Sequence, residues 1–427
     1  MRFAASSPQP DPAFSHRVGT TRVRVTTPDG APLAGTEVVV RQRSHAFGFG
    51  CIGFEFVPLA EEPAPPTTAE GSGLDRPALE DLAEKWFDVF NLATLPFYWG
   101  GFEPVRGHPR TAPLRAAARF FTERGARVKG HPLVWHTLTA PWLRDLPVDE
   151  IERVQRERIR RDVGDFAGLI DMWDAINEVV IMPVFDKEAN GITRLAREAG
   201  RIGMIRLAFE EARAANPDAT LILNDFDMSS AYDCLLEGAL EAGIAIDVLG
   251  LQSHMHQGYW GEEKTMRVLE KFSRYGLPIH FTESTLLSGD LIPPDIVDLN
   301  DHQVPHWPST PEGEERQADE IVRHYRTLLA HPSVEAVTYW GITDAGAWLG
   351  APGGLVRADG TPKPAYDALR SLVREQWWLA PTTMVTDDDG VVAVRGWYGG
   401  YEITAGGRRA TFDVARGAEF TTVVVQA

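Results

Sequence analysis

Apolar runs of strand length alternate with helix-like stretches through most of the chain. Eight runs have the length and flanking turn residues of buried strands, and they lie at 47–54, 90–99, 127–136, 172–178, 220–226, 247–254, 279–283 and 334–342. After each run, apolar residues recur every three or four positions, which predicts a helix. Regular strand–helix alternation predicts a parallel sheet. Eight such units over about 330 residues predict an α/β fold of the closed (β/α)8, or TIM barrel, kind.

An open, doubly wound sheet is the alternative arrangement of the same elements. Such sheets often bind dinucleotides through a Gly-x-Gly-x-x-Gly turn that joins a strand to a helix. No such turn lies between a predicted strand and the helix that follows it. The barrel is therefore the favoured architecture.

The two ends of the chain have a different pattern from the middle. Residues 1–19 are rich in Ser and Pro and have no apolar periodicity, and we expect a flexible N-terminal arm. Alternation at 22–26, the turn Asp29-Gly30 and an apolar run at 36–40 predict a hairpin within a β segment at 20–45. Residues 377–427 contain further short strand-like runs. We expect the two β segments to form a small accessory module beside a barrel at 46–376.

Composition and charge narrow the class of partner. The formal net charge is −18, with 60 acidic against 42 Lys and Arg residues, which disfavours nucleic acid and anionic membranes. No apolar stretch approaches a membrane span, and no signal peptide is visible near Met1. We expect a cytoplasmic protein, or a secreted one whose leader is missing from this sequence. The two cysteines, Cys51 and Cys234, are expected to be free core thiols.

Two glutamates follow apolar strand runs and suggest the chemistry. Met172 to Glu178 ends in Asn177-Glu178, and the seventh predicted strand ends at Glu283. In a barrel of parallel strands, the carboxyl ends of the strands meet at one mouth, where active sites lie. Two carboxyl groups facing each other across a cleft can cleave a glycosidic bond, one as acid and one as nucleophile or base.

Other strand ends carry groups that bind sugars. Aromatic faces stack on sugar rings, while amides and imidazoles bond to hydroxyl groups. The candidates at the ends of the third, fifth, sixth and eighth strands are His131, Trp135, Asn224, Asp225, Gln252, His254, Trp340 and Trp348.

Taken together, these motifs resemble glycoside hydrolase family 10, which is best known for endo-β-1,4-xylanases. The matching segments are Gly130 to His136, Trp173 to Glu178, Asn224-Asp225, Gly250 to His254, Thr282-Glu283 and Trp340 to Asp344. The resemblance implies that Glu178 is the acid/base and Glu283 the nucleophile. It implies substrate contacts from His131, Trp135, Asn177, Gln252, Trp340 and Trp348, with His254 orienting the nucleophile. It implies no cofactor and a carbohydrate, such as xylan or a xylo-oligosaccharide, as substrate.

The sequence departs from the family pattern in two places. The family's Glu-Asn-x-x-Lys-Trp at the second strand is here Thr94 to Trp99, with Tyr98 in the place of Lys. Replacing hydroxyl-binding groups by aromatic and apolar ones weakens discrimination for an unsubstituted sugar. The family's Asp two residues after the nucleophile is Thr285. We expect this change to alter how His254 is oriented and how the nucleophile ionises.

We expect hydrolysis with retention, for which the two carboxyl groups stand roughly 5–5.5 Å apart. The long loops at 55–78 and 286–312 could close one end of the cleft. One alternative is a metal-dependent hydrolase, because imidazoles bind zinc and the candidate ligands include His131, His136, His254, His256 and Asp344. A second alternative is a non-catalytic glycan-binding barrel. A third is a β-glycosidase that acts on a different or substituted glycan.

Overall fold

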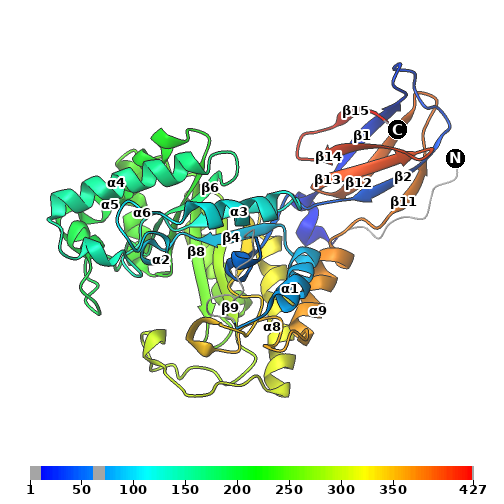
Figure 1. The fold of residues 1–427 in the computed structure, drawn as a ribbon. Coiled ribbons are helices and arrows are strands. Elements are labelled where there is room, and N and C mark those ends of the chain that lie inside the picture. Colours follow the sequence, from blue (N-terminus) through cyan, green and yellow to red (C-terminus); the bar gives the residue numbers. More distant parts are fainter. Residues whose placement is uncertain (1–10, 61–72, 426–427) are drawn as a thin grey trace. The chain divides into compact units, whose positions relative to one another are not determined.

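The computed structural model describes residues 11–60 and 73–425 (Figure 1). Its contacts divide the chain into two compact units. One unit runs from Phe49 to Asp367, and the chain on either side of it forms the other. Among the described residues, none of the helices combines the length and apolar character needed to cross a bilayer.

The larger unit is built around a closed barrel of eight strands, which neighbour one another in the order β10-β3-β4-β5-β6-β7-β8-β9. The strands are β3 (Gly48–Ile52), β4 (Leu92–Pro96), β5 (Arg127–His131), β6 (Met172–Asn177), β7 (Thr220–Asp225), β8 (Val248–Met255), β9 (Ile279–Leu286) and β10 (Val334–Tyr339). The strands from β3 to β10 pair in parallel, and nearly every strand residue is buried. This matches the near-continuous apolar runs of the sequence, because a barrel strand packs on both of its faces. The predicted TIM barrel is confirmed.

A helix follows each barrel strand and covers the outside of the barrel (Figure 1). These helices are α1 (Arg76–Val89), α3 (Thr111–Thr122), α4 (Val148–Asp165), α5 (Gly191–Ala215), α6 (Ser230–Glu241), α7 (Gly261–Ser273), α8 (Pro311–Ala330) and α9 (Pro364–Ser371). Side-chain caps begin several of them, for example Asp75 on α1, Asn190 on α5 and Thr310 on α8. The helix α5 is broken at Gly200, where φ is 70°.

Two predicted strands end earlier than expected, and this moves candidate residues from strands to loops. The strand β4 stops at Pro96 and is followed by the short helix α2 (Trp99–Phe102). The strand β5 stops at His131, immediately before Pro132. Proline has no N–H with which to continue a strand ladder. Trp135 therefore lies on the loop that follows β5, where it is free to turn into the barrel mouth.

The smaller unit contains two sheets with the strand orders β12-β1-β15 and β11-β2-β13-β14. Its strands are β1 (Val18–Thr26), β2 (Glu37–Gln42), β11 (Thr382–Val385), β12 (Val391–Trp397), β13 (Gly399–Ala405), β14 (Arg408–Val414) and β15 (Phe420–Val424). Buried valines from both chain ends, Val23 and Val40 with Val392 and Val394, share one core with Tyr401. The N- and C-terminal β segments therefore form one module.

Two expectations for the smaller unit are corrected. The segments at 22–26 and 36–40 do not pair as a hairpin, because β1 and β2 belong to different sheets. The turn at Gly30 is present, but the chain after it crosses to the other sheet. Residues 12–17 form a 3-10 helix and β1 begins at Val18, so the expected flexible arm does not extend to residue 19. Residues 1–10 of that arm lie outside the described residues.

Both cysteines are free, as expected, but they differ in burial. Cys51 on β3 is buried, which agrees with the expectation of a core thiol. Cys234 on α6 is exposed, so that part of the expectation is wrong.

Candidate active site

Glu178 stands at the carboxyl end of β6 in a strained backbone conformation. Its φ is 57°, in the left-handed region, which costs a residue other than glycine about 1–2 kcal/mol. Its N–H donates to the carbonyl of Asn224 at 2.9 Å, so the end of β7 holds this turn in place. The Trp135 indole donates to Oε2 at 2.8 Å, and the amides of Asn177 and Gln252 each donate to Oε1 at 3.2 Å. The carboxyl group is therefore fixed from three directions.

Glu283 lies on β9 and is 4% exposed. The Asn224 amide donates to its Oε1 at 2.9 Å, and His254 Nε2 lies 3.1 Å from its Oε2. His131 Nε2 lies 4.0 Å from Oε1. The two glutamates thus reach the same barrel mouth from strands that are separated by β7 and β8 in the barrel order.

A short chain of amides joins the two carboxyl groups. The side-chain oxygen Oδ1 of Asn177 accepts hydrogen bonds from the Asn224 amide at 2.7 Å and from the Gln252 amide at 3.1 Å. Asn224 also donates to Glu283, and Gln252 also donates to Glu178. Asn177 is therefore the centre of a network that sets the position of one carboxyl group relative to the other.

The surroundings shift the ionisation of both carboxyl groups. Burial raises the pKa of Glu178 to about 7, and the charge of Glu283 adds to that effect, whereas the hydrogen bonds from Trp135 and the amides oppose it. Burial also raises the pKa of Glu283, but the nearby His131 and Lys129 side chains oppose this rise. The cation Lys129 thus acts on Glu283, while the indole and amide donors that contact Glu178 are neutral.

Lys129 and Asp174 were not predicted as site residues. Both are almost fully buried inside the barrel, and the Asp174 carboxylate lies 2.7 Å from Lys129 Nζ and 2.6 Å from His131 Nδ1. Burial disfavours the ionised form of Asp174, yet Lys129 and His131 hold its pKa below the ordinary value. Charged residues at interior strand positions 129 and 174 were the signal for this network.

Thr285, which stands where the family pattern has an Asp, contacts His254. Its hydroxyl lies 3.0 Å from His254 Nδ1, on the opposite side of the ring from Glu283. Burial lowers the pKa of His254 to about 3, so the ring is neutral near pH 7. An ionised carboxylate can only accept, so Nε2 carries the hydrogen that bonds Glu283, and Nδ1 accepts from Thr285.

Aromatic rings form one wall of the site. Tyr98 lies 5.6 Å from His131 and 5.4 Å from Trp135, and Trp340 lies 5.2 Å from His131, measured between ring centroids. Phe54, which was not predicted, packs against both Tyr98 and Trp340. Burial raises the pKa of the Tyr98 hydroxyl, and the nearby carboxylates raise it further.

Two predicted residues lie at the edges of this constellation. Trp348, 39% exposed, packs against His254 with the two rings tilted and their centroids 4.9 Å apart. Asp225 accepts hydrogen bonds from the N–H groups of Val180 and Asp227, and burial raises its pKa to about 7. Asp225 therefore supports the loop after Glu178.

A cavity of about 470 Å³ opens beside Tyr98. Its lining is mixed: Leu138 and Pro141 are apolar, Arg144 and Glu188 carry opposite charges, and Thr139 and Asn190 are polar. Leu138 is 55% exposed and has a φ of 49°. The cavity extends the site beyond the aromatic wall.

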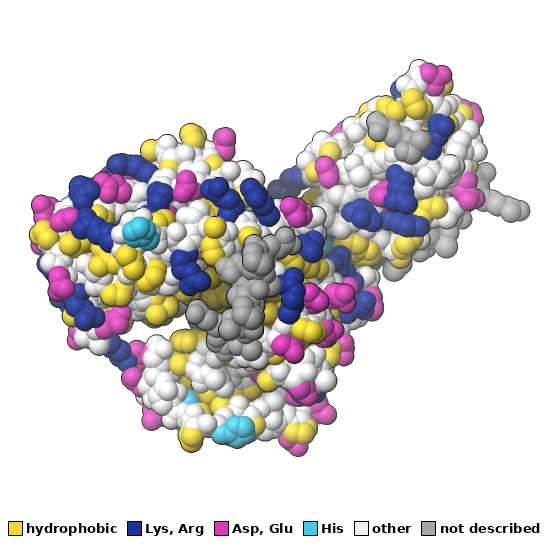
Figure 2. Space-filling model, in the orientation of Figure 1, with side chains coloured by type: hydrophobic (Ala, Val, Ile, Leu, Met, Phe, Trp, Pro, Cys, Tyr) yellow, Lys and Arg dark blue, Asp and Glu magenta, His cyan; other side chains and the backbone are white. Residues whose placement is uncertain are grey.

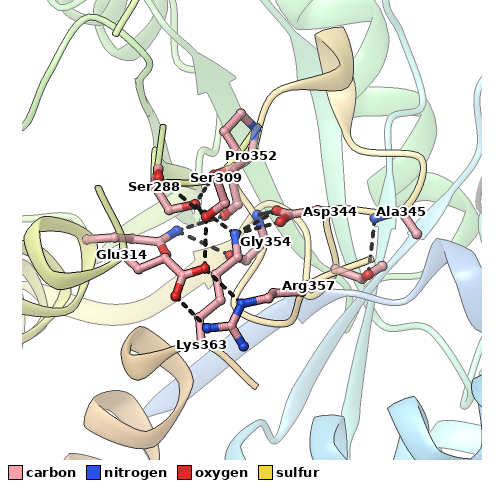
Figure 3. Close-up of polar contacts among 12 residues, drawn as sticks. Ser288, Ser309, Glu314, Asp344, Ala345, Pro352, Gly354, Arg357 and Lys363 are labelled. Atoms are coloured by element: carbon pink, nitrogen blue, oxygen red, sulfur yellow. Dashed lines mark hydrogen bonds and ion pairs between the residues drawn. The ribbon is translucent and has the colours of Figure 1, made fainter. Parts of the chain in front are cut away.

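The candidate metal ligands do not gather into one site. In the described ranges, no group of three or more His, Cys, Asp or Glu side chains is placed to hold a metal ion. Asp344 instead forms an ion pair with Lys363 at 2.7 Å (Figure 3). The ring of His136 packs against Phe185, with centroids 4.5 Å apart.

The chain is similar to several known proteins. Residues 97–372 match the model of the family described as "Glycosyl hydrolase family 10". The chain is 28% identical over 316 residues to endo-1,4-beta-xylanase B of Thermotoga neapolitana, covering 69% of this chain and 85% of that one. It is 26% identical over 399 residues to the anti-sigma-I factor RsgI6 of Acetivibrio thermocellus, covering 91% of this chain and 45% of that one.

The fold has counterparts among solved structures. Xylanase 10B from Thermotoga petrophila, solved in complex with xylobiose, superposes with a TM-score of 0.61 at 23% identity. The match covers 77% of this chain and 94% of that one.

Proposed function

The chain belongs to glycoside hydrolase family 10, and from this premise we propose that it hydrolyses β-1,4 bonds of xylan or xylo-oligosaccharides with retention of configuration. One observation carries the proposal. Glu178, which is partly buried and directly follows β6, and the buried Glu283 of β9 meet at the barrel mouth and share the amide network centred on Asn177. Two carboxyl groups with unlike surroundings are what acid/base and nucleophilic roles require.

In the first step, protonated Glu178 donates its proton to the glycosidic oxygen, and the Glu283 carboxylate attacks the anomeric carbon. The carbon–oxygen bond breaks, the leaving sugar departs as an alcohol, and a covalent glycosyl–Glu283 ester forms. A pKa of about 7 keeps Glu178 protonated in weakly acidic solution, as this step requires. His254 and Asn224 donate to the Glu283 carboxylate and hold it in line for attack.

In the second step, ionised Glu178 takes a proton from water, and the oxygen of that water attacks the anomeric carbon. The ester bond to Glu283 breaks, and the sugar is released with its original configuration. The Trp135 hydrogen bond favours the ionised form of Glu178 that this step needs.

The binding groups support a pentose or hexose backbone. Trp340 and Trp348 offer apolar faces, while His131, Asn177 and Gln252 offer hydrogen bonds close to the carboxyl groups. The relatives named xylanases make xylan the first choice among such backbones.

The cavity beside Tyr98 favours a second candidate, a substituted xylan. Where the family carries a lysine, Tyr98 leads to an opening bounded by Leu138, Pro141 and Arg144. A side group that has both apolar and polar parts would fit this mixed lining, which also includes Glu188 and Asn190. Under this alternative, substituted chains are hydrolysed faster than unsubstituted chains of the same length.

A panel of polysaccharides tests the proposal. Purified protein is incubated with unsubstituted xylan, substituted xylan, β-glucan and mannan, and the released reducing sugars and product lengths are measured. We expect release from one or both xylans that exceeds release from the other two. Release from β-glucan or mannan alone would contradict the xylan assignment, and a preference between the two xylans decides between the two candidates.

A further inference from the structure

The segment between β9 and α8 leaves the barrel and returns to the point where it left. Thr310 donates its N–H to the carbonyl of Ser288 at 2.8 Å, and the hydroxyls of Ser288 and Ser309 lie 2.8 Å apart. Residues 289–308, which we call the strap, are thus a loop whose two ends are pinned together.

A buried ionic cluster fixes the base of the strap (Figure 3). Lys363 is fully buried and its Nζ lies 2.8 Å from the Ser288 hydroxyl and 2.7 Å from an Asp344 oxygen. Beside it, Glu314 accepts from Arg357 Nε at 2.8 Å and from the Ser309 hydroxyl at 3.0 Å. Buried ion pairs that lose one partner are costly, so this base holds one arrangement.

The middle of the strap lies on the end of β8. Ile292 donates its N–H to the carbonyl of His256 at 2.9 Å. The Gln257 side chain donates to the carbonyls of Pro293 and Ile296 at 2.9 and 2.8 Å. The strap therefore runs across the barrel mouth beside His254, which bonds Glu283.

The far part of the strap reaches the loop that follows Glu178. Lys187 Nζ lies 2.7 Å from an oxygen of Asp298 and 2.7 Å from one of Asp301, and these two bonds raise its pKa. Lys187 follows β6, whereas the strap follows β9, and β7 and β8 lie between these strands in the barrel. The contact therefore closes a bridge over the ends of β7 and β8.

The loop that carries Lys187 is itself held to the barrel unit. Arg201 Nε donates to the carbonyl of Val180 at 2.7 Å, and Arg197 Nε donates to that of Pro183 at 2.9 Å. Figure 2 shows a hollow in the barrel unit, between the part that carries α4 and α5 and the part that carries the strap. The base of the strap and the loop that carries Lys187 are both held in place. The ion pairs of Lys187 therefore decide whether the strap and this loop stay joined.

We propose that the ion pairs of Lys187 with Asp298 and Asp301 make the strap a wall on the β7–β8 side of the cleft and so limit glycan length there. This inference rests on the proposed function. The aromatic wall of Tyr98, Trp135 and Trp340 lies on the opposite arc, where no such bridge crosses among the described residues. A bound glycan then extends from Glu178 and Glu283 mainly along the aromatic wall. Lys187 is a positioning residue, because it holds the strap in place.

The test compares a long and a short substrate in matched variants. We measure kcat/KM for soluble xylan and for an aryl β-xylobioside in wild type, Lys187→Ala, Lys187→Arg and Arg267→Ala. Arg267 forms an exposed ion pair with Glu263 on α7 and serves as the control. We expect Lys187→Ala to raise the ratio of xylan to aryl xylobioside activity about two- to fivefold, because exposed ion pairs such as these two contribute little each. Lys187→Arg and Arg267→Ala keep the wild-type ratio.

An equal ratio in Lys187→Ala and Arg267→Ala would overturn the inference. Hydrogen exchange of residues 289–308 supplies a readout that needs no activity. We expect faster exchange in Lys187→Ala than in wild type or Arg267→Ala, and unchanged exchange would also overturn the inference. Failure of wild type to cleave either substrate would refute the proposed function, while the exchange result still judges the strap.

Discussion

Glu178 and Glu283 carry the same chemical group at the same barrel mouth, but their neighbours differ. Around Glu178, the donors are the neutral indole of Trp135 and two amides, and burial raises the pKa to about 7. Around Glu283, Lys129 and His131 oppose the rise that burial causes. One fold thus supplies a carboxyl group that keeps its proton and another that is readier to lose it.

The difference comes mainly from the interiors of β5 and β6. Lys129 and Asp174 form an ion pair below the mouth. His131 connects this pair to Glu283, because its Nδ1 contacts Asp174 and its Nε2 lies 4.0 Å from the Glu283 carboxylate. The imidazole nearest to Glu178 is that of His136, whose Nε2 lies 3.9 Å from Oε2. Burial lowers the pKa of His136 to about 4, so this ring is neutral near pH 7 and places no positive charge beside Glu178. The comparison makes distinct predictions for substitutions on each side.

Removal of the nucleophile should have the largest effect. Glu283→Ala should reduce kcat on every substrate by about 10⁴-fold or more, because no other carboxylate can form the covalent ester. Steady-state rates on xylan and on an aryl xylobioside measure this. Glu211→Gln, at a carboxylate that pairs with Arg156 and Arg160 on the barrel exterior, is the control and should keep most activity. Near-normal turnover by Glu283→Ala would break the assignment.

Removal of the acid should have a smaller and substrate-dependent effect. Glu178→Ala should slow xylan hydrolysis by about 10²- to 10⁴-fold, the usual contribution of general acid–base catalysis. Aryl glycosides with an acidic phenol need no proton on departure, so their first step should be slowed less. Added azide, which attacks without losing a proton, should restore turnover of such substrates. Equal losses on xylan and on the activated aryl glycoside would contradict an acid role for Glu178.

The pH dependence should report the same contrast. Activity requires Glu178 protonated and Glu283 ionised, so kcat/KM should fall above about pH 7 and should also fall on acidification through the pKa of Glu283. Trp135→Phe removes a hydrogen bond that lowers the pKa of Glu178. The alkaline limb should therefore move to higher pH while the acidic limb stays in place. Movement of the acidic limb alone would show that Trp135 acts on the other carboxyl group.

The smallest effect is expected at Thr285. Thr285→Val keeps the shape of the side chain but removes the hydroxyl that donates to His254. We expect kcat to fall about two- to tenfold, which corresponds to one neutral hydrogen bond, because His254 is then less well oriented toward Glu283. Rate measurements with Thr285→Ser, which restores the hydroxyl, should recover most of the loss. A Ser variant as slow as the Val variant would remove the hydrogen bond from the explanation.

The strand and helix order could be read from the sequence because each barrel strand is buried on both faces and is followed by an amphipathic helix. The thirteen candidate site residues could be found for a related reason. A polar residue that follows a buried barrel strand emerges at the mouth of the barrel, where the other strands also end. Trp135 still reaches the site from a loop, because Pro132 ends the strand early.

Other features could not be predicted from local pattern. Lys129 and Asp174 stand out in the sequence as charges inside strands, but only the structure shows that they pair across β5 and β6. The ion pairs of Lys187 join segments that are more than 100 residues apart, and surface charges carry no signal of their partners. The hairpin predicted from residues 22–26 and 36–40 was wrong for the same reason, because alternation predicts a strand but not the sheet that it joins.

The stereochemistry of the first product tests the central claim most directly. Proton NMR of the anomeric region during the first minutes of xylo-oligosaccharide hydrolysis separates the two anomers before they interconvert. If Glu283 forms a covalent ester and Glu178 activates water on the same face, the β-anomer appears first and the α-anomer grows only by mutarotation. Initial appearance of the α-anomer would mean direct attack by water and would contradict the roles assigned to both glutamates.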